Sequence, residues 1–322
     1  METGENKREY GFDNIRFLLI LCVVVGHLLE IRNPFGEGDL LYRGIYSFHM
    51  PAFLFIAGWF ARYDRKKIIT GLLLPYLVFQ VAYILFDRWL YGSTRTIQFT
   101  TPYWLLWFLL ALLFYNLLLP LYDVAGWKKR LAVWLFVVVV SVAVGYDTSV
   151  GYGMSLSRFF VFQPWFLLGF YLRRADSLTS RLKNLPRSMK LLAGGGMLLV
   201  LIGAMVVLYR LPITGQMLYG SYSYASLNYH GGIRLFSAGL ALIWILFLTF
   251  VLRPAVNIRI PLVTAIGQNT LPVFLLHGFA VKYIGNRCPD ILENPVGFLL
   301  IACGIVALLG NPVAARLVGQ KR

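Results

Sequence analysis

Long apolar runs separated by short polar loops cover most of the chain. They lie near residues 15–31, 44–61, 67–86, 103–121, 131–145, 156–172, 190–209, 232–252, 261–281 and 296–315. A helix of about 20 apolar residues is long enough to cross the hydrocarbon core of a bilayer. The pattern therefore predicts an all-α fold, a polytopic membrane helix bundle of about ten transmembrane helices.

The composition agrees with this fold and predicts its orientation. Of the 322 residues, 58% are hydrophobic and only 14% are charged, whereas soluble domains average about 25% charged residues. Most of the 30 Lys and Arg residues fall in alternate loops and in the two tails, and such loops face the cytoplasm. We expect one membrane-embedded domain over residues 1–322, with short cytoplasmic tails at about 1–13 and 316–322.

The net charge of +16 follows from this topology, so its expected partner is anionic membrane lipid and not nucleic acid. The Arg181–Lys190 stretch is the longest and most basic of the predicted inner loops. The three cysteines make no disulfide framework, and we expect no metal ion in the protein.

The first apolar run carries polar residues that lipid alone would not tolerate. Arg16 and His27 are eleven residues apart, which is about three helical turns, so both leave the same face about 16 Å apart along the axis. Glu30 follows His27 by one turn, within hydrogen-bonding reach. Intramembrane charges usually mark functional sites. The alternative is an Arg that extends to the inner headgroups and a His at the outer interface.

Further polar residues lie in the outer halves of other spans. His49 is in the second span, Arg158 in the sixth, Arg234 at the start of the eighth and His277 in the ninth. Arg158 either faces a wet cavity or pairs with an acid such as Glu30, and both readings place it inside the bundle. Their matched depth suggests one polar chamber that opens outward, with the first-span Arg below it.

Three other segments bear on the interior of the bundle. Gly267, Gln268, Asn269 and Pro272 interrupt the ninth span, where polar groups are tolerated only against protein or water. The seventh span is rich in glycine, which favours close helix packing. In the long outer loop at 210–232, tyrosines and amides suit a sugar, or form an interfacial aromatic cluster. We expect Trp104 to belong to such an aromatic belt.

Five sequence motifs resemble the acyltransferase family 3 membrane proteins. They are Arg16 with His27, SFHMPAFLFIAGWF at 47–60, WLLWFLLALLFYNLL at 104–118, PWFLLGFYLRR at 164–174 and IGQNTLPVFLLH at 266–277. The second and last look closest to the fucose 4-O-acetylase-like branch. The resemblance implies transfer of an acetyl group from cytosolic acetyl-CoA to a hydroxyl of a cell-surface or exported glycan, at the bacterial cytoplasmic membrane.

The resemblance also implies a base at His27 and a cation facing the acyl donor at Arg16. We expect Arg173 and Arg174, at the inner end of the sixth span, to assist with the phosphates of CoA.

On this hypothesis His27 takes the proton of a sugar hydroxyl, and Glu30 orients the imidazole. His49, Arg158 or Arg234 donates to the developing oxyanion. Both arginines, together with His277 and Asn269, are the candidate substrate-binding residues.

Two other classes of function fit the polar chamber. A permease or binding protein would use it to pass or sense a small polar ligand. A structural subunit of a glycan-export complex would have the same chamber but would catalyse no reaction in it.

Overall fold

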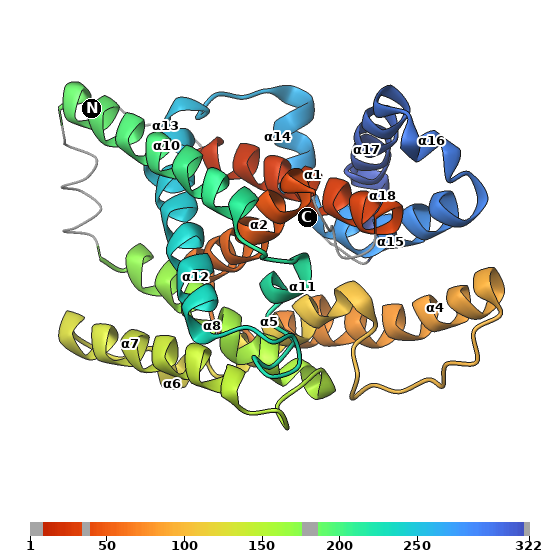
Figure 1. The fold of residues 1–322 in the computed structure, drawn as a ribbon, viewed down its shortest axis with the longest axis horizontal. Helices are drawn as coiled ribbons and strands as arrows, with labels where there is room; N and C mark the ends of the chain where they lie inside the picture. Colours follow the sequence, from red (N-terminus) through yellow and green to blue (C-terminus); the bar gives the residue numbers. More distant parts are fainter. Residues whose placement is uncertain (1–8, 34–38, 176–185, 319–322) are drawn as a thin grey trace.

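The computed structural model describes residues 9–33, 39–175 and 186–318, and over these residues the protein is a helix bundle without strands (Figure 1). Its elements in chain order are α1 (Gly11–Arg32), α2 (Leu40–Trp59), α3 (Arg65–Ile68), η2 (Ile69–Leu73), α4 (Leu74–Tyr91), η3 (Trp104–Leu106), α5 (Trp107–Leu117), α6 (Leu119–Tyr122), α7 (Trp127–Ala143), η4 (Val144–Tyr146), η5 (Gly153–Ser155), α8 (Leu156–Arg173), α10 (Arg187–Arg210), α11 (Gly215–Leu218), α12 (Gly231–Leu246), η6 (Phe247–Leu252), α13 (Arg253–Ala255), α14 (Pro261–Gln268), α15 (Thr270–Arg287), α16 (Asp290–Glu293), α17 (Pro295–Leu309) and α18 (Pro312–Leu317).

The predicted all-α class is confirmed. Each predicted span overlaps one helix or a run of consecutive helical segments. Among the described residues, five helices are long and apolar enough to cross a membrane: Gly11–Arg32, Arg65–Tyr91, Trp127–Tyr146, Ser188–Arg210 and Gly231–Ala255. The count of ten and the cytoplasmic termini stay predictions. Part of the basic charge behind them, namely Lys7, Arg8, Arg181, Lys183, Lys321 and Arg322, lies outside the described residues.

Helix α1 crosses the centre of the molecule, with α14 and α17 above it and α4 and α5 below it in Figure 1. It packs against α2, α14, α15 and α17. One hydrophobic cluster lies around α2, α5 and α8 and includes Phe55 and Phe166, which are buried. A second joins α1, α4, α5 and α15 and includes Tyr83 and Leu275. Helix α1 contributes to both clusters, so its side chains lie at the junction of the two halves of the core.

The first turns of α1 are held by hydrogen bonds to the segment around α14. The Asn14 amide donates to the carbonyls of Val256 and Ile258 at 2.7 and 2.9 Å, and it accepts from the Thr264 hydroxyl at 2.8 Å. Because these groups are largely buried and satisfied, the position of α1 along its axis is well defined. This sets the level of Arg16.

Glycines allow the closest helix contacts. A Cβ on Gly58 of α2 would lie 1.9 Å from the Phe166 carbonyl oxygen of α8, and one on Gly169 of α8 would lie 2.0 Å from the Phe55 carbonyl oxygen. Each helix thus presents a glycine to the backbone of the other. In the seventh span, a Cβ on Gly194 would lie 3.0 Å from the Val251 side chain, which agrees with close packing. The expectation is wrong for Gly195, Gly196 and Gly203, where a Cβ would meet no described atom within 4 Å.

We expect Gly58→Ala to destabilise the protein by about 1–3 kcal/mol, a typical overpacking cost. The added methyl would meet a backbone carbonyl, which no rotamer change can move away. The measurement is thermal unfolding in nanodiscs. Gly195→Ala is the matched control, because this helical glycine has open space around it. Equal melting temperatures for the two variants would contradict the assigned α2–α8 contact.

Candidate active site

One face of α1 lines three successive cavities. Arg16, Ile20 and Val23 line the first, Val23 and His27 the second, and Glu30 the third. We call them the Arg16 cavity, the His27 cavity and the Glu30 cavity; their volumes are about 300, 40 and 590 Å³. The intervals of three and four residues keep these side chains on one side of the helix over about 21 Å. The predicted common face of Arg16 and His27 is therefore the face that lines the cavities.

The Arg16 cavity is mostly apolar, with walls from α1, α2, α5 and α15. Its polar side chains include Arg16 and Gln268. Arg16 pairs with Asp13 at 3.3 Å, and its guanidinium lies 4.6 Å from the centre of the Phe60 ring. Gln268 donates to the other oxygen of the Asp13 carboxylate at 3.1 Å. The cavity thus combines an apolar interior with a positioned cation.

The Arg16 and His27 cavities are separate but share three wall residues: Val23, Met50 and Phe274. A molecule that reaches from one cavity to the other must displace these side chains. Met50 has three rotatable side-chain bonds and adapts readily to a new neighbour.

His27, which lines the His27 cavity, forms a hydrogen-bonded pair with the buried His277 of α15. His27 Nδ1 lies 2.7 Å from His277 Nε2. His277 Nδ1 lies 2.8 Å from the carbonyl oxygens of Val273 and of Phe274. A carbonyl only accepts, so His277 Nδ1 carries the proton, and in the neutral ring Nε2 accepts from His27 Nδ1. This leaves the Nε2 of neutral His27 with a free lone pair.

His49 lines the same cavity from α2 and is buried. Its Nδ1 donates to the Ile45 carbonyl at 2.7 Å. By the same rule, Nε2 of the neutral ring is an acceptor. Neutral His49 therefore has no second proton to donate to an oxyanion. Of the three predicted oxyanion donors, only the two arginines have N–H groups for this role.

Arg158 supplies a cation to the His27 cavity. Its Nε donates to the Tyr219 carbonyl at 3.1 Å, and its guanidinium lies 4.9 Å from the ring centres of Trp107 and Tyr152. Its Nη1 is buried and has no hydrogen-bond partner in the described part of the chain. An unpaired buried donor is costly, so this atom is ready to bind an acceptor atom of a ligand.

Glu30 does not orient His27 as expected. Its carboxylate accepts from the hydroxyls of Tyr46 at 3.2 Å and Tyr219 at 3.3 Å, while the hydrogen bond of His27 goes to His277. Tyr219 is also hydrogen-bonded to the Tyr42 hydroxyl. Glu30 thus anchors a tyrosine cluster between the His27 cavity and the Glu30 cavity.

The family model described as an acyltransferase domain (Acyl_transf_3) matches residues 9–309. The chain belongs to this acyltransferase family. Several of its helices are long and apolar enough to cross a membrane.

Two relatives match shorter segments. A "Nodulation protein NolL" of Sinorhizobium fredii is 40% identical over 63 residues, covering 18% of this chain and 17% of the relative. A "Nodulation protein NolL" of Mesorhizobium japonicum is 34% identical over 88 residues, covering 23% of this chain and 24% of the relative. The chain thus matches less than a quarter of each curated relative's length. No solved structure matches significantly.

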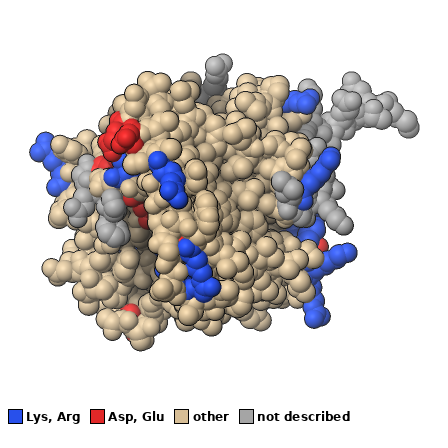
Figure 2. Space-filling model, turned by 90° about the vertical axis from the view of Figure 1, so that its right-hand side faces the viewer, with Lys and Arg blue, Asp and Glu red and all other residues tan. Residues whose placement is uncertain are grey.

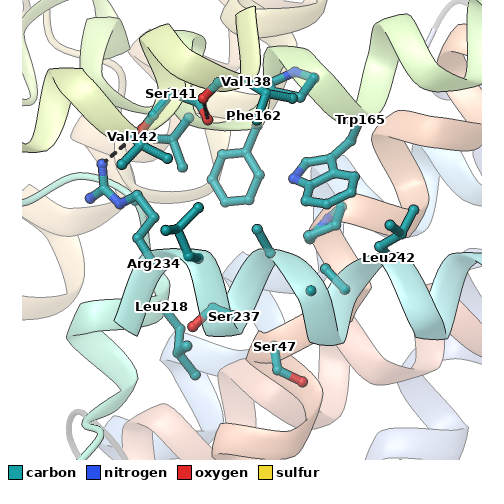
Figure 3. Close-up of a pocket in the computed structure, with 18 of the residues that line it drawn as sticks. Ser47, Val138, Ser141, Val142, Phe162, Trp165, Leu218, Arg234, Ser237 and Leu242 are labelled. Carbon is teal, nitrogen blue, oxygen red and sulfur yellow. Dashed lines mark hydrogen bonds between the residues drawn. The ribbon is translucent and has the colours of Figure 1, made fainter. Parts of the chain in front are cut away.

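In this member of the family, Arg234 lies apart from the three cavities along α1. It lines another pocket between α7, α8 and α12 (Figure 3). Its guanidinium donates to the carbonyls of Ser141 and Tyr222 at 3.3 and 3.2 Å and to the Tyr229 hydroxyl at 2.8 Å. These bonds tie α12 to α7 and to the loop that precedes α12, so the interactions of Arg234 indicate a structural role instead of the predicted substrate contact.

Asn269 also makes a structural contact. Its side-chain amide donates to the Ala265 carbonyl at 2.7 Å, at the break between α14 and α15. The neighbouring Gln268 and Thr270 line the Arg16 cavity. The interruption of the ninth span therefore exposes its polar groups to a cavity, as the sequence suggests.

The arginines at the end of α8 do not join Arg16. Neither Arg173 nor Arg174 is among the described residues that line the Arg16 cavity. Arg174 packs on Phe170, 3.6 Å from its ring centre, and pairs with Asp123 at 3.8 Å. Their predicted contact with CoA phosphates stays a prediction.

Sequence reasoning assigned Trp104 only to an interfacial belt. Its ring centre lies 4.5 Å from that of His27, and it also lines the Glu30 cavity. Its backbone has φ of +35°, a region that bulky residues seldom adopt and that often marks functional sites. The tryptophan pair in WLLW was the only signal in the sequence. Which way the Trp104 ring points could be known only from the fold.

Proposed function

We propose that this membrane acyltransferase moves an acetyl group from cytosolic acetyl-CoA to a sugar hydroxyl of a cell-surface or exported glycan, in the bacterial cytoplasmic membrane. The observation that carries the proposal is the His27–His277 pair. It leaves an imidazole lone pair in a cavity that also holds an Arg158 nitrogen to which no described residue is hydrogen-bonded. A base beside an oxyanion donor is the arrangement that acyl transfer requires.

The Arg16 cavity fits the arm of an acyl thioester. Its apolar walls suit an extended chain, and Arg16 lies at the end that we predict to be cytoplasmic. A guanidinium there suits the phosphate groups of a nucleotide-bearing donor. We assign Arg16 to donor binding, and the side chains of Val23, Met50 and Phe274 to the passage toward His27.

His27 Nε2 accepts the proton of the attacking hydroxyl as that oxygen bonds to the thioester carbonyl carbon. The resulting imidazolium keeps its Nδ1–H bond to His277 Nε2, which holds the ring in place. His27 then returns the proton to the departing thiolate sulfur as the carbon–sulfur bond breaks. His277 acts here as a positioning residue, the role that the sequence predicts for Glu30.

Arg158 Nη1 donates to the carbonyl oxygen as it becomes negative. A guanidinium stays charged throughout the reaction, and Trp107, Tyr152 and Tyr219 already hold it in place. His49 Nε2 is left to accept a hydrogen bond from the substrate.

The proposal is tested by incubating the protein in nanodiscs with acetyl-labelled acetyl-CoA and glycan from the source cells. We expect label on the glycan, and loss of one acetyl mass increment from surface glycans of cells without the protein. Unchanged surface glycans together with no transfer would contradict the proposal. Uptake of a polar solute that does not depend on acetyl-CoA would instead support a permease.

A further inference from the structure

The largest of the three cavities along α1 is not used by the chemistry above. The Glu30 cavity, of about 590 Å³, lies at the end of α1 that we predict to be extracytoplasmic. Its size falls within the usual range of small-molecule sites. Its charged side chains are Glu30, Asp87, Arg95 and Lys282. The positions of these residues on α1, α4, the 92–103 loop and α15 make the cavity a meeting point of distant segments.

One wall of the cavity is held in place by a buried glutamine. Gln80 of α4 is 1% exposed. Its amide nitrogen donates to the carbonyls of Gln98 and Thr101 at 2.7 and 2.9 Å, and its amide oxygen accepts from the Tyr103 backbone at 2.8 Å. Tyr76 adds a bond to the Phe99 carbonyl at 2.6 Å. The loop that carries Gln98, Thr101 and Tyr103 into the cavity is therefore preorganised.

An ion pair that is surrounded by aromatic rings lines the cavity. Lys282 Nζ lies 3.1 Å from the Asp87 carboxylate, and both side chains are largely buried. The same nitrogen lies 5.2 Å from the ring centres of Tyr91 and Tyr103 and 5.3 Å from that of Trp104. Aromatic faces suit the C–H faces of a ring, and fixed polar groups suit its hydroxyls.

Trp104 connects this cavity to the reaction centre. It lines the Glu30 cavity, and its ring contacts that of His27 at 4.5 Å. Glu30 makes a second connection, because it binds Tyr46 and Tyr219, which line the His27 cavity. A ring seated in the Glu30 cavity is thus separated from the base by little more than one side chain.

The charges of the cavity are balanced. Two carboxylates, of Glu30 and Asp87, face two cations, of Arg95 and Lys282, and the Asp87–Lys282 pair is already neutralised. The surface at this end of the molecule is mostly uncharged, with acidic and basic side chains scattered across it (Figure 2). Such a surface attracts neither anions nor cations strongly.

We propose that the Glu30 cavity binds an uncharged sugar ring of the acceptor, with Asp87, Lys282 and Gln98 contacting its hydroxyls and Trp104 packing on its face. This inference rests on the proposed function. It adds the place where the acceptor binds and its charge class: neutral hexoses or deoxyhexoses are favoured over uronic acids and sugar phosphates.

The test is saturation-transfer NMR on the full chain in nanodiscs, which needs no turnover. The probes are methyl glycosides of neutral hexoses and 6-deoxyhexoses, with methyl glucuronide as the charged probe. We expect saturation of the neutral glycosides, at least ten-fold weaker saturation of the glucuronide, and no displacement by CoA. Asp87→Asn combined with Lys282→Met is expected to abolish the signal, and Gln98→Ala, at the exposed mouth, to weaken it with the fold intact.

The matched control is Arg32→Met, which removes another ion pair, with Asp39 at 3.4 Å, outside the described lining of the cavities. It should keep the wild-type signal. Preference for the glucuronide, displacement by CoA, or an undiminished signal in both cavity variants would overturn the inference. Absence of acetyl transfer beside unchanged sugar binding would instead reject the proposed function and leave this site in place.

Discussion

His27→Ala is expected to lower the rate of acetyl transfer by about 10²–10⁴-fold, the range contributed by a positioned general base. The substitution removes the atom that takes the hydroxyl proton. The imidazole lone pairs that remain nearby, on Nε2 of His277 and of His49, belong to rings held by backbone carbonyls of α15 and α2, so neither ring takes the position of His27. The measurement is the initial rate with labelled acetyl-CoA in nanodiscs. CoA should still raise the melting temperature of the variant, since the Arg16 cavity is unchanged.

Two other histidines provide controls. His230→Ala changes a histidine whose ring accepts from Gly232 N in the outer loop, and it should transfer acetyl at the wild-type rate. His277→Phe keeps the bulk of the positioning residue but loses the bond to His27, so we expect a slower rate and an altered pH profile. Wild-type transfer by His27→Ala would contradict the mechanism.

Arg158→Met is expected to lower kcat by about 10²–10³-fold, the usual effect of removing one oxyanion donor, or about 2.7–4 kcal/mol. Met fills similar space, while the positive charge and the free Nη1 are lost. The measurement is kcat at saturating acceptor, with thermal unfolding in parallel because the bond to the Tyr219 carbonyl is also lost. Arg158→Lys should recover part of the rate, since it restores the charge but not the planar geometry.

Arg234→Met is the matched control for Arg158. Both are buried arginines that contact aromatic rings, but the polar contacts of Arg234 are to Ser141, Tyr222 and Tyr229. We expect it to lower the melting temperature and leave the kcat of the folded protein unchanged. An equal loss of kcat in the two variants would show that Arg158 acts through stability alone.

The sequence predicted best what depends on one helix. The positions of Arg16 and His27 on one face of α1 follow from helical periodicity, and the structure lines its cavities with that face. Depth in the membrane could also be counted along each span. The direction in which each helix turns its side chains within the bundle could not be predicted in this way. Arg234 therefore shares the predicted depth of Arg158 but lies in another pocket.

The choice between competing partners needed the fold. Glu30 is one turn from His27, yet Tyr46 and Tyr219 from other segments bind its carboxylate, and His277 from α15 takes its predicted place. The Glu30 cavity could not be predicted for the same reason. Asp87 and Lys282 are 195 residues apart, and the residues around each of them give no sign that the two side chains pair.

The most direct test of the account is a structure of the full chain with acetonyl-CoA, in which a methylene group is inserted between the sulfur and the carbonyl carbon, so that no thioester bond can break. The account predicts the nucleotide at the Arg16 end, the arm past Val23, Met50 and Phe274, and the acyl carbonyl between His27 Nε2 and Arg158 Nη1. An arm bound outside the Arg16 cavity, or a carbonyl beyond hydrogen-bonding distance of Arg158, would contradict it.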